Sequence, residues 1–361
     1  MALIDLRSDT VTRPTPAMRE AMQTAELGDD GREGDPTVRR LEALAAQKTG
    51  KDAAVFMPSG TMTNLVALLT HTNRGAEVLL HEGAHIIHYE NFGIANLANL
   101  YHRAIPGALG AMDLDRLESA LGTGLSARGL NASLVCMENT HNNASGAVLS
   151  LEHMAAVQAL ARRFGAAVHT DGARLFNAAV ALGVPASAIA KHTDSVCFCI
   201  SKGLSAPVGS LLCGSAAFIE RARHFKRMVG GNMRQSGVVA AAGIVALETM
   251  VDRLVDDHRS ARRLGEGLAA LDARLVDLEA LQTNIVRANV GVSGSNAQRW
   301  VSDLREEGIR VSDYGSSQVR FVTHHEVDTA AIDATLAAIR RIWDRHTGGA
   351  PRASGREERA G

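Results

Sequence analysis

The chain has 361 residues, of which 46% are hydrophobic, and this excludes a small scaffold that depends on disulfides or a metal for its stability. The formal net charge is −1, with both signs mixed along the chain, so no broad cationic surface is available and no nucleic-acid partner is expected. Four cysteines lie in apolar runs without metal-ligand spacing, which predicts buried, reduced thiols. They are Cys136, Cys197, Cys199 and Cys213.

Residues 1–7 contain no basic segment followed by an apolar one, as a secretory leader would. No apolar run approaches the length that crosses a membrane. We therefore expect a cytoplasmic protein without a membrane partner. The histidine spacings match no metal-binding template, and the sequence predicts no metal site.

From about residue 15 to residue 250, short apolar runs alternate with longer helical patterns, which is typical of βαβ units and a mostly parallel sheet. Thr15 before Pro16 and Asp35 before Pro36 are N-cap signals for two early helices, the second ending at Gly50. Most candidate strands are apolar on both faces, as a covered sheet requires. These strands are residues 53–57, 77–81, 133–138, 166–170, 195–200 and 210–214.

After a long helix predicted over residues 235–254, the pattern changes to that of a smaller α+β domain. Its predicted strands lie near residues 283–290, 309–312 and 319–323, and its predicted helices near 296–307 and 329–345. The sequence thus predicts an α/β protein with a large domain over residues 1–250, including the N-terminal segment, and a small C-terminal α+β domain over 251–345. Residues 346–361 lack apolar periodicity and predict a disordered tail.

In open α/β sheets, ligands bind beyond the carboxyl ends of the strands, so polar residues that follow strands are candidate site residues. Ser59, Gly60 and Thr61 follow the first predicted strand and lead into a helix. Free backbone N–H groups, hydroxyls and the positive end of a helix dipole suit a phosphate there. An ordinary N-capped helix is the alternative interpretation of this motif alone.

Asp171 and Lys202 each follow a predicted strand, and His141 follows another. A lysine amine can form a Schiff base, while a carboxylate facing a pyridine nitrogen keeps that nitrogen protonated. Either residue alone would suggest a structural ion pair. Together with the phosphate turn, in this chain order, they predict a site for pyridoxal 5'-phosphate (PLP). His141 is a candidate base near neutral pH.

Eight short motifs occur in order along the chain. They are residues 5–12 (DLRSDTVT), 58–62 (PSGTM), 84–86 (AHI), 138–142 (ENTHN), 169–174 (HTDGAR), 201–204 (SKGL), 233–235 (MRQ) and 319–324 (VRFVTH). By these motifs the chain resembles, from about residue 5 to residue 345, the low-specificity L-threonine aldolase family. This family belongs to the β-eliminating lyase and threonine aldolase group of fold-type I PLP enzymes.

The resemblance implies that Lys202 forms the Schiff base with PLP, that Asp171 pairs with the pyridinium nitrogen and that His85 stacks on the ring. The cofactor-binding set that it implies is Ser59, Gly60, Thr61, His85, Asp171, Arg174, Lys202 and Arg234. In the family Arg234 would reach the cofactor of a neighbouring subunit, which implies a homotetramer with shared sites.

The resemblance also implies that Ser8, Arg174 and Arg320 hold the substrate carboxylate, where bidentate arginine contacts orient the bonds at Cα. The implied reaction is retro-aldol cleavage of L-threonine, L-allo-threonine or a related β-hydroxy-α-amino acid to glycine and an aldehyde. His85 and His141 are both candidates for the base that takes the hydroxyl proton.

One segment departs from the family pattern. Residues 31–34 read Gly-Arg-Glu-Gly, so Arg32 stands where the family commonly has an aromatic residue near the substrate side chain. Arg32 is either a selectivity residue for a polar or acidic substrate or a solvated loop residue. A lyase, racemase or aminotransferase on the same scaffold is the rival function, because a fold does not determine which Cα bond is broken. A regulatory PLP-binding protein would not need Lys202, Asp171, Arg174 and His85 together.

Overall fold

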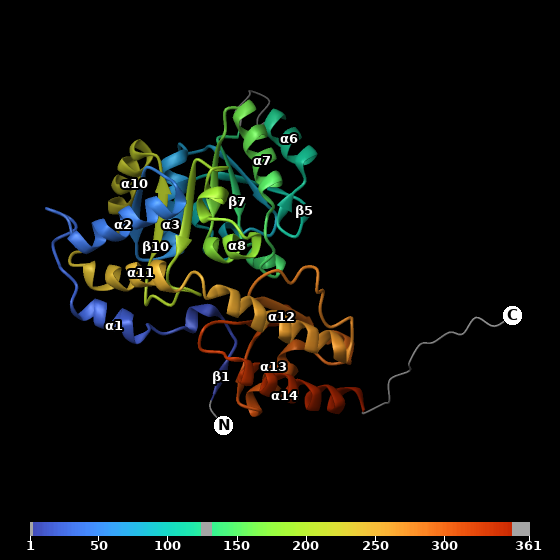
Figure 1. Cartoon of the computed structure of the whole chain (residues 1–361). Coiled ribbons are helices and arrows are strands. Elements are labelled where there is room, and N and C mark those ends of the chain that lie inside the picture. The colour runs from blue at the N-terminus through green and yellow to red at the C-terminus, as the bar shows by residue number, and fades with distance from the viewer. Residues whose placement is uncertain (1–2, 124–131, 349–361) are drawn as a thin grey trace.

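The computed structural model describes residues 3–123 and 132–348, and a seven-stranded sheet lies at its centre (Figure 1). The strands in spatial order are β2 (Ala53–Met57), β10 (Ser210–Gly214), β9 (Ser195–Cys199), β8 (Ala167–Asp171), β7 (Leu134–Glu138), β3 (Glu77–His81) and β4 (Tyr101–Ile105). β10 is antiparallel to both of its neighbours, and the other neighbouring pairs are parallel. The predicted α/β fold with a mostly parallel sheet is confirmed.

Helices cover both faces of this sheet, which explains why its inner strands are apolar throughout. In β2, Phe56 packs on one face, and Val55 and Met57 pack on the other. The face of Val55 is covered by α3 (Gly60–His71) and α10 (Ala216–Met228). The opposite face is covered by α2 (Pro36–Thr49), α7 (Leu151–Arg163), α8 (Leu175–Leu182) and α9 (Ala186–Ala190).

The remaining elements of this part are short or lie at its periphery. α1 (Pro16–Gln23) packs against α11 (Gly237–Thr249), which also contacts α2, and α6 (Leu114–Thr123) packs against α7. The short helices α4 (His85–His88) and α5 (Gly93–Asn96) follow β3, and the hairpin of β5 (Gly107–Ala108) and β6 (Ala111–Met112) follows β4.

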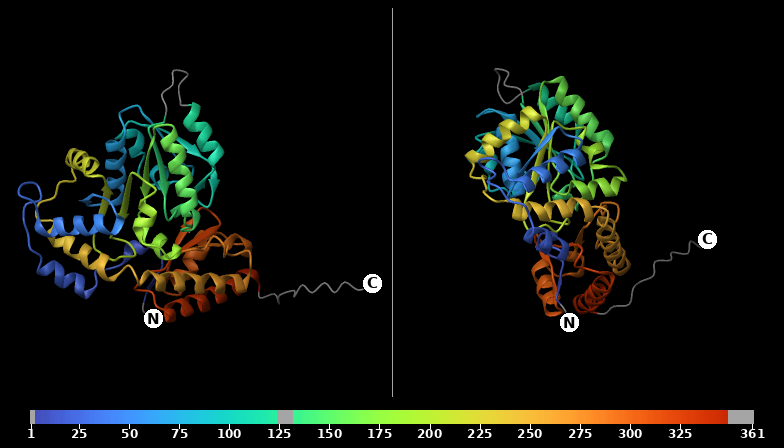
Figure 2. Two further views of the ribbon diagram at one scale, coloured as in Figure 1. Left: turned by 45° about the horizontal axis from the view of Figure 1, so that its top comes forward. Right: turned by 60° about the vertical axis from the view of Figure 1, so that its left-hand side comes forward.

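A second hydrophobic cluster lies below the first in Figure 1, around a three-stranded antiparallel sheet. The sheet contains β11 (Ile285–Asn289), β14 (Gln318–Val322) and β13 (Ser312–Tyr314). The helices packed around it are α12 (Leu254–Leu271), α13 (Ala297–Glu306) and α14 (Thr329–Thr347). The two views of Figure 2 show this orange and red part as a separate layer beside the large sheet.

The N-terminal segment packs with this second cluster. β1 (Ile4–Asp5) pairs in parallel with β12 (Ile309–Arg310), and Leu6 is buried in the second cluster. The Leu6 N–H donates to the carbonyl of Arg310 at 2.8 Å, and its carbonyl accepts from Val322 N–H at 2.8 Å. The first residues of the chain are therefore held by its last third. The predicted boundary between two domains near residue 250 stays a prediction.

The strands of the large sheet that the sequence predicts lie within one residue of the observed bounds, but several other expectations were wrong. β4 was not predicted, because four of its five residues are not buried and its sequence has no apolar run. The predicted helix over 235–254 ends at Thr249, and α12 follows it without having been predicted. The predicted strand over 309–312 is split between β12 and β13, which belong to different sheets.

The predicted disordered tail was wrong at its first residues. His346 and Thr347 belong to α14, which ends at Gly348 with φ +72°, and His346 Nε2 lies 2.7 Å from Asp303 Oδ2. The rest of that prediction falls on residues 349–361, outside the described residues. Within residues 3–123 and 132–348, no helix has the length and hydropathy that a membrane crossing requires.

We expect Leu6→Ala to lower the free energy of unfolding by about 2–5 kcal/mol, because it leaves a cavity in the second cluster. Leu3→Ala is the matched control, since Leu3 is 55% exposed. Urea unfolding followed by circular dichroism measures both variants. Equal stability of the two variants would contradict the packing of the N-terminal segment.

Candidate active site

The predicted site residues gather at the carboxyl ends of three neighbouring strands. Glu138 ends β7 and Asp171 ends β8, and the two are Cα partners in the sheet. Lys202 follows the end of β9, and its charge acts on the pKa values of both Asp171 and Asp9. Parallel strands bring these three loops together at one edge, which is where ligands bind in such sheets.

Asp171 is a buried carboxylate that the surroundings hold in the charged form. Burial alone would raise its pKa, but His85, Lys202 and hydrogen bonds lower the pKa below its ordinary value of 3.8. Asn64 Nδ2 donates to Asp171 Oδ2 at 2.8 Å, and the Ala173 N–H donates to Oδ1 at 3.0 Å. A permanent negative charge therefore lies beneath the loops that carry His85 and Lys202.

Asn64, on α3, fixes the partners of this carboxylate. Its Nδ2 also donates to Glu90 Oε1 at 2.8 Å, so its Oδ1 must face His169, whose Nε2 lies 3.2 Å away. His169 Nε2 therefore donates to Asn64 Oδ1. Burial lowers the pKa of His169 to about 4, so at neutral pH its Nδ1 accepts from Ser195 Oγ at 2.8 Å.

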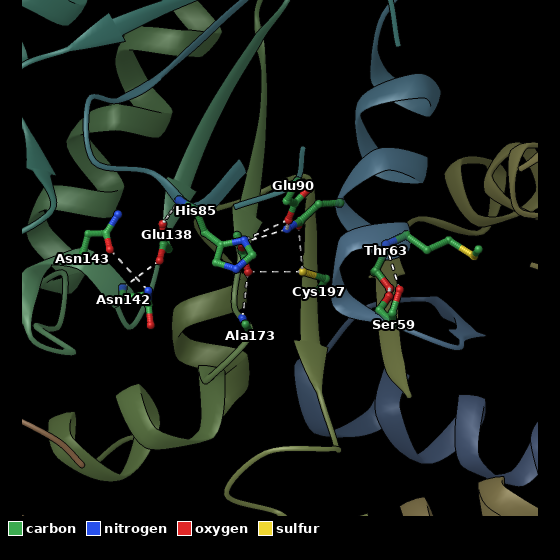
Figure 3. Close-up of polar contacts among 12 residues, drawn as sticks. Ser59, Thr63, His85, Glu90, Glu138, Asn142, Asn143, Ala173 and Cys197 are labelled. Atoms are coloured by element: carbon green, nitrogen blue, oxygen red, sulfur yellow. Dashed lines mark hydrogen bonds and ion pairs between the residues drawn. The ribbon is translucent and has the colours of Figure 1, made fainter. Parts of the chain in front are cut away.

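His85 lies between two acidic side chains (Figure 3). Its backbone N–H donates to Glu138 Oε2 at 2.7 Å, and its Nδ1 donates to Glu90 Oε1 at 3.1 Å. Burial acts to lower the pKa of His85, but the Glu90 hydrogen bond and the charges of Asp171 and Glu138 raise it above 6.5. This arrangement leaves Nε2 as the ring nitrogen available to a ligand.

His141 has a different environment. It is fully buried, neither ring nitrogen has a hydrogen-bond partner among the described residues, and Nε2 lies 3.8 Å from Glu138 Oε2. Burial lowers its pKa to about 4, so the ring is neutral at pH 7. The ring is tightly enclosed, since a Cβ on Gly110 would come within 2.5 Å of it.

Glu138 ties the two histidine loops together. Besides His85 N–H, it accepts the N–H of Asn142 on Oε1 at 2.7 Å (Figure 3). Burial and the neighbouring charge of Asp171 raise the pKa of Glu138 to about 7. One buried side chain thus sets the distance between the loop of His85 and the loop of His141.

The N-terminus of α3 can hold an anion at the same edge. Ser59 Oγ accepts from the Met62 N–H at 3.2 Å, which leaves the N–H groups of Gly60 and Thr61 without an acceptor in their own helix. A Cβ on Gly60 would come within 2.8 Å of Cys199 Sγ, so this turn lies directly against the end of β9. Cys199 precedes Lys202 by three residues, so the turn lies near the loop that carries Lys202.

Two arginines from different parts of the fold meet at Asn142. Arg174 donates to both carboxylate oxygens of Asp9, at 2.7 and 2.8 Å, and Arg320 Nη2 donates to Asn142 Oδ1 at 3.1 Å. Arg174 Nη1 also reaches Asn142 Oδ1, at 3.5 Å. Ser8 precedes Asp9, and its Oγ accepts from the Thr10 N–H at 3.2 Å. These guanidiniums offer donors that suit a carboxylate.

The structure does not bring Arg234 to these residues. Its side chain is 67% exposed, and Nη1 lies 3.5 Å from Asp29 Oδ1. Arg32, on the loop of Asp29, is 79% exposed, and its Nε lies 3.9 Å from Asp29 Oδ2. Within one chain, both arginines therefore lie on the surface.

The sequence alone did not identify Asp9, Asn64, Glu90 or Glu138 as site residues, although Asp9 and Glu138 lie in the family motifs. Asn64 had one signal, since it is an amide residue directly before the apolar run of residues 65–69. Glu90 had none. Atoms of His85, Glu90 and Asp171 lie within 4.8 Å of one another, a spacing at which a cation could bind, but hydrogen bonds among these residues and Asn64 account for the cluster.

The residues present fit PLP and an amino acid. A lysine beyond a strand, a buried charged carboxylate and an anion-binding helix N-terminus lie beside one another. The guanidiniums of Arg174, which follows β8, and of Arg320, on β14, meet at Asn142 beside them. Together these four features suit a cofactor with an aldehyde, a pyridine nitrogen and a phosphate, and a substrate with a carboxylate.

Comparison with known proteins agrees with this geometry. A family model described as "Beta-eliminating lyase" matches residues 5–290. Low-specificity L-threonine aldolase 1 of Arabidopsis thaliana is 43% identical over 345 residues, covering 94% of this chain and 96% of that protein. The low specificity L-threonine aldolase of Escherichia coli K12 is 42% identical over 326 residues, covering 90% of this chain and 95% of that protein.

Among solved structures, the threonine aldolase of Leishmania major superposes with a TM-score of 0.81 at 18% identity, covering 94% of this chain and 99% of that one. A putative L-allo-threonine aldolase of Listeria monocytogenes superposes with a TM-score of 0.76 at 20% identity, covering 94% and 96%. At these identities the structures support the fold, and the sequence relatives establish the family. The chain therefore belongs to the threonine aldolase family of PLP-dependent β-eliminating lyases.

Proposed function

We propose that this protein cleaves L-threonine, L-allo-threonine or a related β-hydroxy-α-amino acid to glycine and an aldehyde. The observation that carries the proposal is the meeting of Lys202, the charged Asp171 and the Arg174–Arg320 pair at one edge of the sheet. The names of the relatives with more than 40% identity support the same reaction.

In this proposal PLP is held by groups that this chain supplies at one edge of the large sheet. Lys202 would form the Schiff base with the cofactor, Asp171 would keep its pyridine nitrogen protonated, and His85 would cover its ring. Ser59, Gly60 and Thr61 bind the phosphate at the N-terminus of α3. When bound, the cofactor supplies a conjugated ring that accepts the electron pair of the broken Cα–Cβ bond.

Ser8, Arg174 and Arg320 bind the α-carboxylate of the substrate. Asp9 holds Arg174 by two hydrogen bonds, so that guanidinium is already oriented before the substrate arrives. Fixing the carboxylate sets the angle of the Cα–Cβ bond relative to the cofactor, and this angle selects the bond that breaks.

We propose His85 as the base for the β-hydroxyl proton. Its side chain is 28% exposed, while that of His141 is 1% exposed. Because Nδ1 donates to Glu90, the neutral ring presents an unprotonated Nε2 to the substrate. His141 is then a neutral packing residue behind the site, and it remains the alternative base.

Arg234 would act in a neighbouring subunit. It lies on an exposed loop, and we propose that it reaches the phosphate site of a second copy within a homotetramer. The cytoplasmic location expected from the sequence stays a prediction.

The acid limb of the pH profile identifies the base. If His85 takes the proton, kcat/KM for L-allo-threonine falls as the pH drops through a value above 6.5, because His85 must be deprotonated to act. If His141 takes it, the limb lies near pH 4. We expect the first result, and we expect His141→Asn to keep the same limb. A limb near pH 4 in the wild-type enzyme would identify His141.

The reaction is tested by adding PLP to the purified protein and recording the visible spectrum. The substrates to compare are L-threonine, L-allo-threonine, phenylserine and 3-hydroxyaspartate, with glycine and aldehyde assayed in parallel. We expect a Schiff-base absorption band that Lys202→Ala abolishes, and glycine release from at least one substrate. A band without glycine, or with ammonia and a keto acid, would favour another PLP reaction.

A further inference from the structure

A third arginine lies beside the proposed carboxylate-binding pair. Arg287 on β11 and Arg320 on β14 are Cα partners in the antiparallel sheet. Directly opposed residues place their side chains on the same face of a sheet, with Cβ atoms about 5 Å apart. The side chain of Arg287 therefore extends next to that of Arg320, toward the loop of Asn142.

Contacts on two sides hold Arg287 in this place. Its guanidinium carbon lies 3.6 Å from the centre of the Tyr314 ring, a cation–π contact. Its Nη2 donates to the backbone carbonyl of Asn142 at 3.3 Å. Its Nε is buried and has no hydrogen-bond partner among the described residues. The side chain is thus ordered but keeps an unused donor.

A row of contacting side chains connects Arg287 to His85. Its members between these two residues are Tyr314, Asn143 and Tyr89. The hydroxyls of Tyr314 and Tyr89 both donate to Asn143 Oδ1, at 3.1 and 2.9 Å. The ring of Tyr89 lies 5.2 Å from that of His85, measured between centroids. The β-carbon of the substrate carries both the hydroxyl that His85 would deprotonate and the rest of the substrate side chain. Residues next to His85 would therefore lie close to that side chain.

The two guanidiniums of Arg287 and Arg320 carry more positive charge than the single α-carboxylate of a substrate can neutralise. Asp9 pairs with Arg174, but within the described part of the chain no carboxylate forms an ion pair with Arg287 or Arg320. Burial and the charges of Arg174 and Arg287 lower the pKa of Arg320 to about 10, which still leaves the Arg320 guanidinium charged at neutral pH. A substrate with one carboxylate would leave one of the two guanidiniums unpaired.

We propose that Arg287 binds an anionic group on the β-carbon of the substrate, so that the preferred class is β-hydroxy amino acids with a side-chain carboxylate, such as 3-hydroxyaspartate. The proposal rests on the cleavage reaction proposed above. In 3-hydroxyaspartate the Cα–Cβ bond breaks, the β-hydroxyl loses its proton and becomes the aldehyde of glyoxylate, and Cα takes up a proton to give glycine.

Binding of two ligands that cannot be cleaved tests the recognition itself. L-Aspartate and L-asparagine differ by one charge at nearly the same shape, and neither has a β-hydroxyl. With the PLP-loaded enzyme in a calorimeter, we expect aspartate to bind about tenfold more tightly than asparagine, as a charge-assisted hydrogen bond requires. We expect Arg287→Met to bring the two dissociation constants together and Arg287→Lys to keep part of the preference.

Arg259→Met is the matched control for loss of one positive charge, because Arg259 is 74% exposed and pairs with Asp256. It should keep the wild-type preference for aspartate. No preference in the wild-type enzyme, or the same preference in Arg287→Met, would overturn the assignment of Arg287.

Turnover provides the second readout. We expect the ratio of kcat/KM for 3-hydroxyaspartate to that for L-threonine to fall about tenfold or more in Arg287→Met. An equal fall for both substrates would mean that Arg287 supports the site in general and does not select the side chain. If the wild-type enzyme releases glycine from no substrate, the proposed reaction is wrong, and the aspartate preference still decides the role of Arg287.

Discussion

The site depends on keeping one carboxylate charged inside the protein. Burying an ionised carboxylate is costly unless hydrogen bonds and opposite charges compensate, and Asp171 has both. α3 supplies Asn64, α4 supplies its first residue, His85, and the turn after β9 supplies Lys202. The same three elements provide the groups proposed to hold the phosphate, cover the ring and bond the cofactor. The groups that stabilise the buried charge of Asp171 are therefore on the same elements that would form the cofactor site.

Two of the arginines proposed to contact the substrate come from a different part of the fold than Arg174, which follows β8 of the large sheet. Arg320 and Arg287 belong to the small antiparallel sheet, whereas Asn142 follows a strand of the large one. Asn142 is held in turn by Glu138, which also fixes the backbone of His85. The proposed α-carboxylate contacts and the proposed base are thus joined through the buried Glu138 and the partly buried Asn142, although their sequence positions are far apart.

Sequence reasoning was most accurate where burial determines the pattern. The inner strands of the sheet are apolar on both faces, so their bounds and the positions of Asp171 and Lys202 after them could be predicted. It failed where local pattern and tertiary position differ, as in β4, which lies at an edge with little burial, and in α12, which follows α11 after a short break. The roles of Asn64, Glu90 and Arg287 depend on strand register and on contacts between distant segments, and no local pattern records either.

The way in which Asn142 holds the two arginines determines what a substitution at position 287 would change. Arg320 bonds to its side-chain oxygen, whereas Arg287 bonds to its backbone carbonyl, which any residue at that position would retain. Arg320, proposed to bind the α-carboxylate that all α-amino acids share, and Arg287, proposed to bind the variable side chain, are therefore held by different atoms of Asn142. Exchange of the residue at position 287 would therefore leave the contact between Arg320 and the Asn142 side chain in place.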